Sequence, residues 1–62
     1  MEPTFTNIQR LERLDRKLQL IPGVRARFLL DCVRGCLTRA RAGFRFRAET
    51  VDAAEAFVAE HE

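Results

Sequence analysis

The chain has 62 residues, and its formal net charge of +2 hides an uneven distribution. All eleven Lys and Arg residues and four of the nine acids lie in residues 1–47, whereas residues 48–62 carry five acids and no Lys or Arg. This length and composition allow one domain, residues 1–62, and exclude a disulfide-rich scaffold, a structural zinc site and a membrane span, because the chain has two Cys, one His and no long apolar run.

The first predicted helix spans residues 7–20. Thr6 and Gln9 have the spacing of a capping box, in which each side chain hydrogen-bonds the backbone N–H of the other residue. Apolar residues recur at steps of three and four, which places one narrow seam along the helix and predicts packing on one side only. The seam contains Ile8, Leu11, Leu14, Leu18 and Ile21.

A second helix is predicted over residues 24–42, after a break at Pro22 and Gly23. A connection this short favours an antiparallel helical hairpin, and Gly43 is suited to end the second helix. At about 100° per residue, apolar side chains cover a wide arc of this helix. The arc contains Ala26, Leu29, Leu30, Cys32, Val33, Cys36, Leu37 and Ala40.

The width of this apolar arc predicts a second chain. One neighbouring helix does not cover so wide an arc, so part of it is expected to lie in a homodimer interface. A chain of this length also buries only about 60% of its unfolded surface, and small domains often gain stability by oligomerisation. The residues assigned to the dimer interface are Leu29, Val33, Cys36, Leu37 and Ala40.

Residues 44–47 alternate Phe and Arg, a pattern typical of a short strand or of an extended connection that turns both rings inward. Thr50 is then suited to cap a short, Ala-rich third helix over residues 51–60, with Asp52 in its first turn. The sequence therefore predicts an all-α protein with three helices, a helical hairpin followed by a short C-terminal helix, in a homodimeric bundle.

Arginine side chains form a candidate binding surface on and after the second helix. Arg27, Arg34 and Arg41 are seven residues apart and align along its solvent side. Arginine binds phosphates and carboxylates through paired hydrogen bonds, so this face is predicted to bind an acidic protein surface or, as second choice, DNA. The alternative is a solvated face on which Asp31 pairs with Arg27 and Arg34. The full basic face contains Arg25, Arg27, Arg34, Arg39, Arg41, Arg45 and Arg47.

Charges at two predicted helix ends oppose the helix dipole. Arg25 and Arg27 lie in the first turn of the second helix, and Glu60 and Glu62 lie at the end of the third. We expect compensation from contact between the acidic tail and the basic surface, within one chain or across a dimer.

Catalytic and cofactor-binding constellations are not expected. The sequence has no Gly-rich phosphate loop and no Ser/His/Asp set, and its one histidine, His61, lies near the end of the chain. Cys32 and Cys36 lie one turn apart on the apolar arc, where a redox switch or a shared metal site is the alternative to two small buried side chains. We favour the buried side chains and predict no enzyme activity, cofactor, metal or small-molecule substrate.

Part of the chain resembles the two helices of ribbon-helix-helix repressors. The resemblance covers residues 11–37 and rests on Leu14-Asp15, Pro22-Gly23-Val24-Arg25, Phe28-Leu29-Leu30 and Val33. In that family a strand before the first helix pairs across an obligate dimer, and its outward residues read the DNA major groove. The corresponding residues 4–8 contain no basic side chain and overlap the predicted Thr6 cap. The resemblance implies a dimeric repressor. Residues 4–8, however, offer no basic side chain that could read the DNA bases.

The leading functional prediction is a small non-catalytic regulator, adaptor or inhibitor that acts by binding another protein. One alternative is a dimeric DNA-binding repressor or antitoxin that uses the arginine face, and a further alternative is a subunit of a larger phage assembly. The Arg- and Ala-rich composition is typical of a bacterial or phage genome. The first residues lack the pattern of a signal peptide, so we expect a cytoplasmic protein that does not enter membranes.

Overall fold

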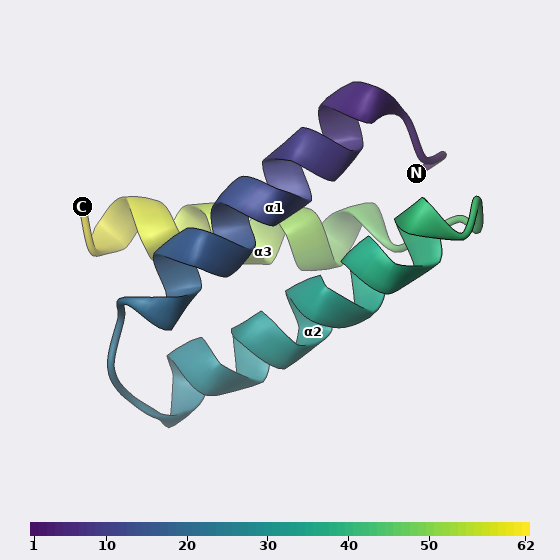
Figure 1. Cartoon of the computed structure of the whole chain (residues 1–62). Helices are drawn as coiled ribbons and strands as arrows, with labels where there is room; N and C mark the ends of the chain where they lie inside the picture. Colours follow the sequence, from purple (N-terminus) through teal and green to yellow (C-terminus); the bar gives the residue numbers. More distant parts are fainter.

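The computed structural model describes all 62 residues and contains three helices and no strand. These are α1 (Phe5–Gln19), α2 (Val24–Arg41) and α3 (Ala48–Glu60). In Figure 1, α1 and α2 form a splayed antiparallel hairpin, and α3 runs behind it from the end of α2 back toward the α1–α2 turn. The predicted all-α fold with three helices is confirmed.

The start of α1 differs from the prediction. Thr4 is the N-cap: its backbone is extended, with φ −135° and ψ 163°, and its side-chain oxygen accepts a hydrogen bond from the Asn7 N–H at 3.2 Å. Thr6 lies in the first turn, so the predicted capping box of Thr6 and Gln9 is wrong. Residues 5–8 are helical, and the strand of ribbon-helix-helix proteins therefore does not form.

Glycines in left-handed conformations stand at both ends of α2. Gly23 is the N-cap with φ 113°, a backbone angle that side chains with a Cβ rarely adopt. At the other end Gly43 has φ 85°, the Phe44 N–H donates to the Arg39 carbonyl at 2.8 Å, and the Gly43 N–H donates to the Ala40 carbonyl at 3.1 Å. These two bonds are the pair that defines a Schellman motif, and Gly43 ends α2 as predicted.

The connection after α2 is extended, and only one of its two rings is buried. Phe46 is 5% exposed, whereas Phe44 is 62% exposed, so the prediction that both rings turn inward is wrong for Phe44. The Met1 backbone nitrogen donates to the Phe46 carbonyl at 2.9 Å, and the Phe46 N–H donates to the Met1 carbonyl at 3.2 Å. These reciprocal bonds tie the first residues to the connection.

α3 begins earlier than predicted. Arg47 is its N-cap, with extended backbone and no side-chain capping bond, and the helix starts at Ala48. Thr50 is therefore inside the first turn instead of capping it, and its side chain approaches the Cys36 thiol. Because Phe46 is anchored in the core, the chain turns into the helix directly after it.

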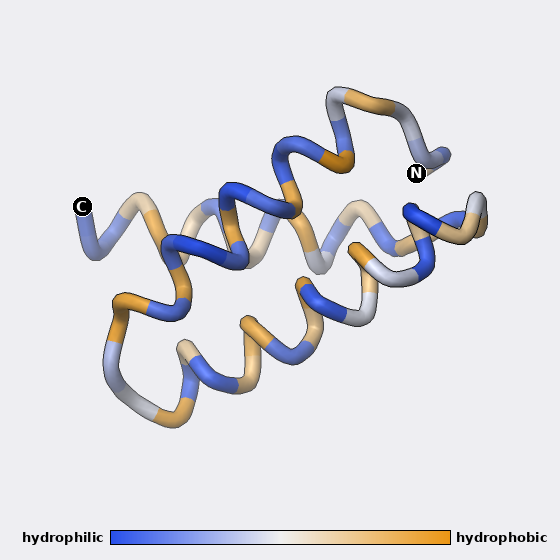
Figure 2. The backbone as a smooth tube through the Cα atoms, in the orientation of Figure 1, coloured by the Kyte–Doolittle hydropathy of each residue, from blue (hydrophilic) through white to orange (hydrophobic).

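The core is one cluster to which all three helices contribute. Figure 2 shows apolar residues recurring along each helix between hydrophilic ones, as expected for helices that bury one side. α1 buries Leu11, Leu14 and Leu18 in this cluster, and α3 buries Val51, Ala54 and Val58. From α2 and the connection it receives Leu29, Leu30, Val33, Cys36, Leu37, Ala40 and Phe46.

The residues assigned to a dimer interface lie within this core. In the single chain Leu29, Val33, Cys36, Leu37 and Ala40 are between 0% and 8% exposed, so they are not available to a second chain. The predicted interface is wrong because two neighbours, α1 and α3, together cover the apolar arc of α2. The accessible surface of 4357 Å² is also close to the roughly 4,100 Å² expected for a folded monomer of this mass.

Candidate interaction surface

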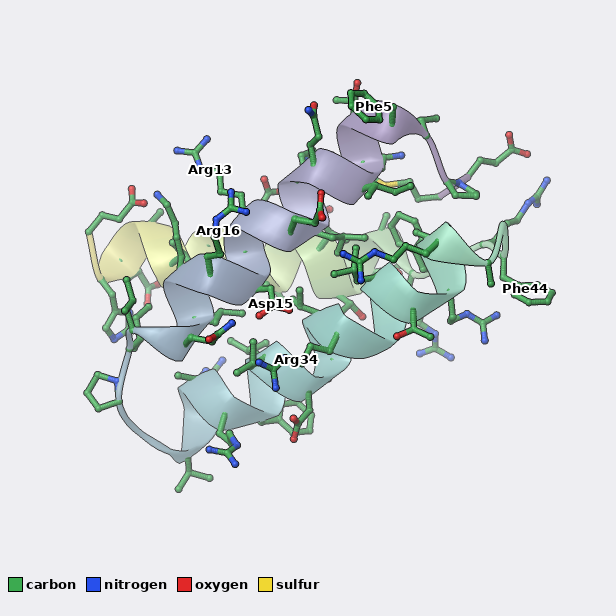
Figure 3. All side chains as sticks on the ribbon, in the orientation of Figure 1. Phe5, Arg13, Asp15, Arg16, Arg34 and Phe44 are labelled. Atoms are coloured by element: carbon green, nitrogen blue, oxygen red, sulfur yellow. The ribbon has the colours of Figure 1, made fainter.

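Five ion pairs join segments that are distant in the sequence, and α1 takes part in four of them. On the side of α1 toward α2, Arg34 Nε lies 3.4 Å from an Asp15 oxygen, and Arg41 donates to Glu12 at 3.0 Å. Figure 3 shows Asp15 and Arg34 pointing toward one another across the hairpin. Both arginines belong to the predicted basic face, so carboxylates of α1 neutralise part of that face.

On its opposite side α1 pairs with the acidic C-terminal region. Arg10 donates to both carboxylate oxygens of Glu55, and Lys17 pairs with Glu62. The hydrogen bond with Glu55 raises the pKa of Arg10, whereas burial acts in the opposite direction. The acidic tail thus meets basic side chains within one chain, and it meets them on α1 instead of on the arginines of α2.

The predicted basic face separates into two groups. Arg34 and Arg41 have the partners described above, and Arg45 pairs with Glu2 at 2.8 Å. The other four arginines of the face have no carboxylate within ion-pair distance, and all four are exposed. They are Arg25, Arg27, Arg39 and Arg47.

Asp31 does not neutralise the arginines beside it. It is exposed and forms no ion pair, so the predicted pairs with Arg27 and Arg34 are wrong. Arg34 turns instead to Asp15, whose carboxylate lies at the edge of the hairpin. Arg27 is left without an acidic partner.

Two cationic residues outside the predicted face are also unpaired. Arg13 and Arg16 point away from the body of the molecule on α1 (Figure 3), and neither has a carboxylate partner. Neither residue was among the predicted site residues. The helical periodicity places both arginines opposite the buried leucines of α1, and this pattern could have identified them from the sequence.

The side of α2 that faces away from the core combines apolar and cationic side chains. Val24 is 88% exposed and Phe28, one turn later, is 65% exposed. These two line a hollow together with Gly23, Arg27 and Asp31. A second hollow lies between α2 and the start of α3, lined by Cys32, Gly35, Cys36, Arg39, Phe46, Arg47 and Thr50. The outer face of α2 denotes here the exposed and half-buried α2 residues that line these two hollows, together with Arg47.

Arg39 is held in place at the edge of the second hollow. Its Nε donates to the Arg45 carbonyl at 2.9 Å, and its guanidinium carbon lies 5.9 Å from the centre of the Phe44 ring. Neither contact neutralises the guanidinium charge. Arg39 therefore presents a positioned positive charge to any molecule that enters this hollow.

The two cysteines differ in exposure. Both are free; Cys32 is half-buried and Cys36 is buried. Burial raises the pKa of the Cys36 thiol, the neighbouring Cys32 adds to the increase, and contacts with Arg47 and Thr50 oppose it. No three of the His, Cys, Asp and Glu side chains lie close enough together to hold a metal ion. Both cysteines line the second hollow, and only Cys36 belongs to the core cluster.

A thiol-specific alkylating reagent is expected to modify Cys32 before Cys36 in the native protein at neutral pH. Alkylation requires an accessible thiolate, and Cys36 is both buried and shifted to a higher pKa. The raised pKa of Cys36 also favours the protonated thiol in the folded state. The Cys36 thiol therefore stabilises the fold below the ordinary thiol pKa, and this contribution to the free energy of unfolding is lost as the pH rises through the raised value. Mass spectrometry of peptides after timed labelling measures the order, with urea-unfolded protein as control. Equal native rates for both thiols would contradict the burial of Cys36.

The pair formed by Arg10 and Glu55 is expected to contribute modestly to stability. Its side chains are 36% and 42% exposed, and exposed pairs contribute about 0.2–1 kcal/mol. Arg10→Glu and Glu55→Arg each place like charges together and should lower the urea midpoint, whereas the double exchange should restore most of the loss. A double-mutant cycle measures the coupling, and additive losses would show that the two side chains do not interact.

None of the three helices is both long enough and apolar enough to cross a membrane. No protein-family model, curated protein or solved structure matches the chain.

Proposed function

We propose that the chain is a small non-catalytic regulator, adaptor or inhibitor that acts by binding another protein. The observation that carries this proposal is the outer face of α2, where exposed Val24 and Phe28 adjoin arginines without carboxylate partners. Aromatic and arginine side chains are enriched at protein interfaces, where an apolar centre is surrounded by a charged rim.

The distribution of ion pairs supports a partner with an acidic surface. Five of the eleven cationic side chains have carboxylate partners inside the chain, and four of these pairs join α1 to its neighbours. The unpaired arginines Arg27, Arg39 and Arg47 line the hollows on the outer face of α2. Acidic groups of a partner would complement them and bring the face toward electrical neutrality.

Affinity purification from the organism that encodes the chain tests the proposal. The wild-type chain and the Phe5→Ala variant should recover the same protein in stoichiometric amount at moderate salt, and the Phe28→Ala variant should recover less. Phe5 is a matched control because it is 76% exposed but lies on α1. The purified partner should then rebind the wild-type chain in calorimetry. Recovery of no stoichiometric protein would count against the proposal.

A second candidate function is DNA binding by a repressor or antitoxin. It is supported by six arginines without carboxylate partners, two of which, Arg13 and Arg16, project from α1. Binding to random duplex DNA should then weaken steeply with added salt and fall in the Arg27→Glu variant, which changes an unpaired arginine. No detectable binding at about 50 mM salt would remove this candidate.

Sedimentation of the purified chain tests the proposed homodimer and the proposed assembly subunit. Because the five residues of the predicted dimer interface are buried, a homodimer requires exposed residues such as Phe28. A dimer that dissociates on Phe28→Arg would support it, whereas particles of higher order would favour a subunit of a larger assembly. A monomer at all concentrations would contradict both the homodimer and the assembly subunit.

A further inference from the structure

The packing of the chain does not explain why residue 35 is a glycine. It lies in the middle of α2, it is exposed, and a Cβ added to it would meet nothing within 4 Å. Its φ is not in the left-handed region, so the backbone does not demand glycine there. Glycine in a helix interior is destabilising relative to alanine. The missing side chain leaves a gap in the wall of the second hollow, where another backbone can approach closely.

The surroundings of Gly35 form a face of the kind that accepts a helix. Phe28 precedes it by seven residues, which places the two about 20° apart around the axis of α2. Val24 and Cys32 lie one turn before and one turn after Phe28, so the line continues with apolar side chains. An amphipathic helix docks through apolar positions at i, i+3, i+4 and i+7, which can pack along an apolar line of this kind, and small residues let helix axes come close together.

Charge on this face selects the occupant. Asp31 is its only acid, whereas Arg27, Arg39 and Arg47 are unpaired. A second copy of the chain packed face to face would therefore bring like charges together. Duplex DNA would satisfy the arginines but would leave Val24 and Phe28 without an apolar partner. A helix with one apolar side and acidic flanks satisfies both groups.

Resting on the proposed function, we propose that the outer face of α2 binds an acidic amphipathic helix of a partner protein. The apolar side of that helix packs on Val24 and Phe28, and its backbone comes closest at Gly35. Its carboxylates pair with Arg27, Arg39 and Arg47 of the same face.

The experiment uses a synthetic helical peptide with Leu at positions i, i+3, i+4 and i+7 and Glu elsewhere as the probe. The matched control peptide carries Lys in place of Glu. Fluorescence anisotropy should show binding of the acidic peptide only, and amide chemical-shift changes should be centred on Val24, Phe28 and Gly35. Shifts centred on Arg13 and Arg16, or equal binding of the Lys peptide, would overturn the proposal. Failure of the acidic peptide to bind at about 100 μM would do the same.

Variants at Gly35 separate binding from folding. Gly35→Ala and Gly35→Leu should both fold with a midpoint at least as high as wild type, because the site is open and glycine is the poorer helix former. Gly35→Leu should nevertheless weaken peptide binding about tenfold or more, while Ala53→Leu, which adds the same side chain on the exposed side of α3, should not. Equal affinity for wild type and Gly35→Leu would refute close approach at this glycine.

The same variants distinguish failure of this proposal from failure of the proposed function. If a stoichiometric protein partner is recovered and binds Gly35→Leu as tightly as wild type, the chain binds proteins through another surface, and only the inference about α2 fails. If no stoichiometric protein partner is recovered, and duplex DNA or an anionic lipid vesicle binds more tightly than the acidic peptide with no effect of Gly35→Leu, both proposals fail.

Discussion

Replacing Leu11 by alanine is expected to remove most of the stability of the fold. Leu11 is 0% exposed and lies in the core cluster where α1 meets the other two helices. A buried Leu→Ala change costs about 2–5 kcal/mol, because transfer free energy is lost and a cavity remains. A domain of this length has about 3–9 kcal/mol of total stability, so the loss is a large fraction of it. Urea unfolding followed by far-UV circular dichroism measures the change, and the thermal midpoint should fall by about 10–40 °C.

Leu20→Ala is the matched control for this experiment. It makes the same substitution at the end of α1, where the side chain is 84% exposed. Its free energy of unfolding should stay within about 0.5 kcal/mol of the wild-type value. Similar losses in the two variants would show that Leu11 does not carry the core.

Replacing Val51 by aspartate is expected to unfold the protein at neutral pH. Val51 is 1% exposed and is one of three side chains through which α3 enters the core. No cationic side chain is buried with it, so the introduced carboxylate would be desolvated without a partner. Breaking or omitting the partner of a buried charge costs about 3–5 kcal/mol, which again approaches the whole stability of a small domain. Loss of the cooperative urea transition is the expected observation.

The control places the same residue on the same helix at an exposed position. Ala53→Asp introduces a solvated carboxylate, and its cost is limited to the lower helix propensity of aspartate, about 0.7 kcal/mol. If Val51→Asp and Ala53→Asp unfold at the same urea concentration, α3 does not pack on the core through Val51. That result would also reopen the question of what covers the arc of α2.

The helices were predictable because their periodicity is strong. The apolar seam of α1 is buried at Leu11, Leu14 and Leu18, and Gly43 ends α2 in the conformation that glycine favours. The caps were less predictable, since Thr4 and Thr6 are both suitable residues and local rules do not choose between them. Thr4 becomes the cap in a fold where tertiary hydrogen bonds hold the Met1 backbone against Phe46, and local rules do not include such contacts.

The sequence pattern of α2 could not show which elements bury its apolar arc. The apolar arc indicates how much surface is buried, but not how many elements of the same chain bury it. Cys36, Ala40 and Ala54 are small side chains, and they allow α3 to pack closely on the arc with few residues of its own. An Ala-rich helix shows a weak apolar signal in sequence, and its share of the core was therefore underestimated.

The ion pairs of the candidate surface were also beyond local rules. Spacing along one helix predicts pairs three or four residues apart, such as Asp31 with Arg27. The pairs that form connect residues 19 apart in the case of Asp15 and Arg34, and 45 apart in the case of Arg10 and Glu55. Only the folded arrangement shows which arginines are left without acids, and those are the residues on which the functional proposals rest.

The two differently charged flanks of α1 also select the handedness of the bundle. A third helix can pack on a hairpin in two mirror-related topologies that bury nearly the same apolar side chains. Apolar contacts alone therefore discriminate poorly between the two topologies. In the topology adopted here, Glu12 and Asp15 meet arginines, while Arg10 and Lys17 meet carboxylates. Exchanging the flanks would set acid against acid and base against base at all four places. Solvent-exposed charges that add little to stability thereby penalise the wrong fold of the same chain.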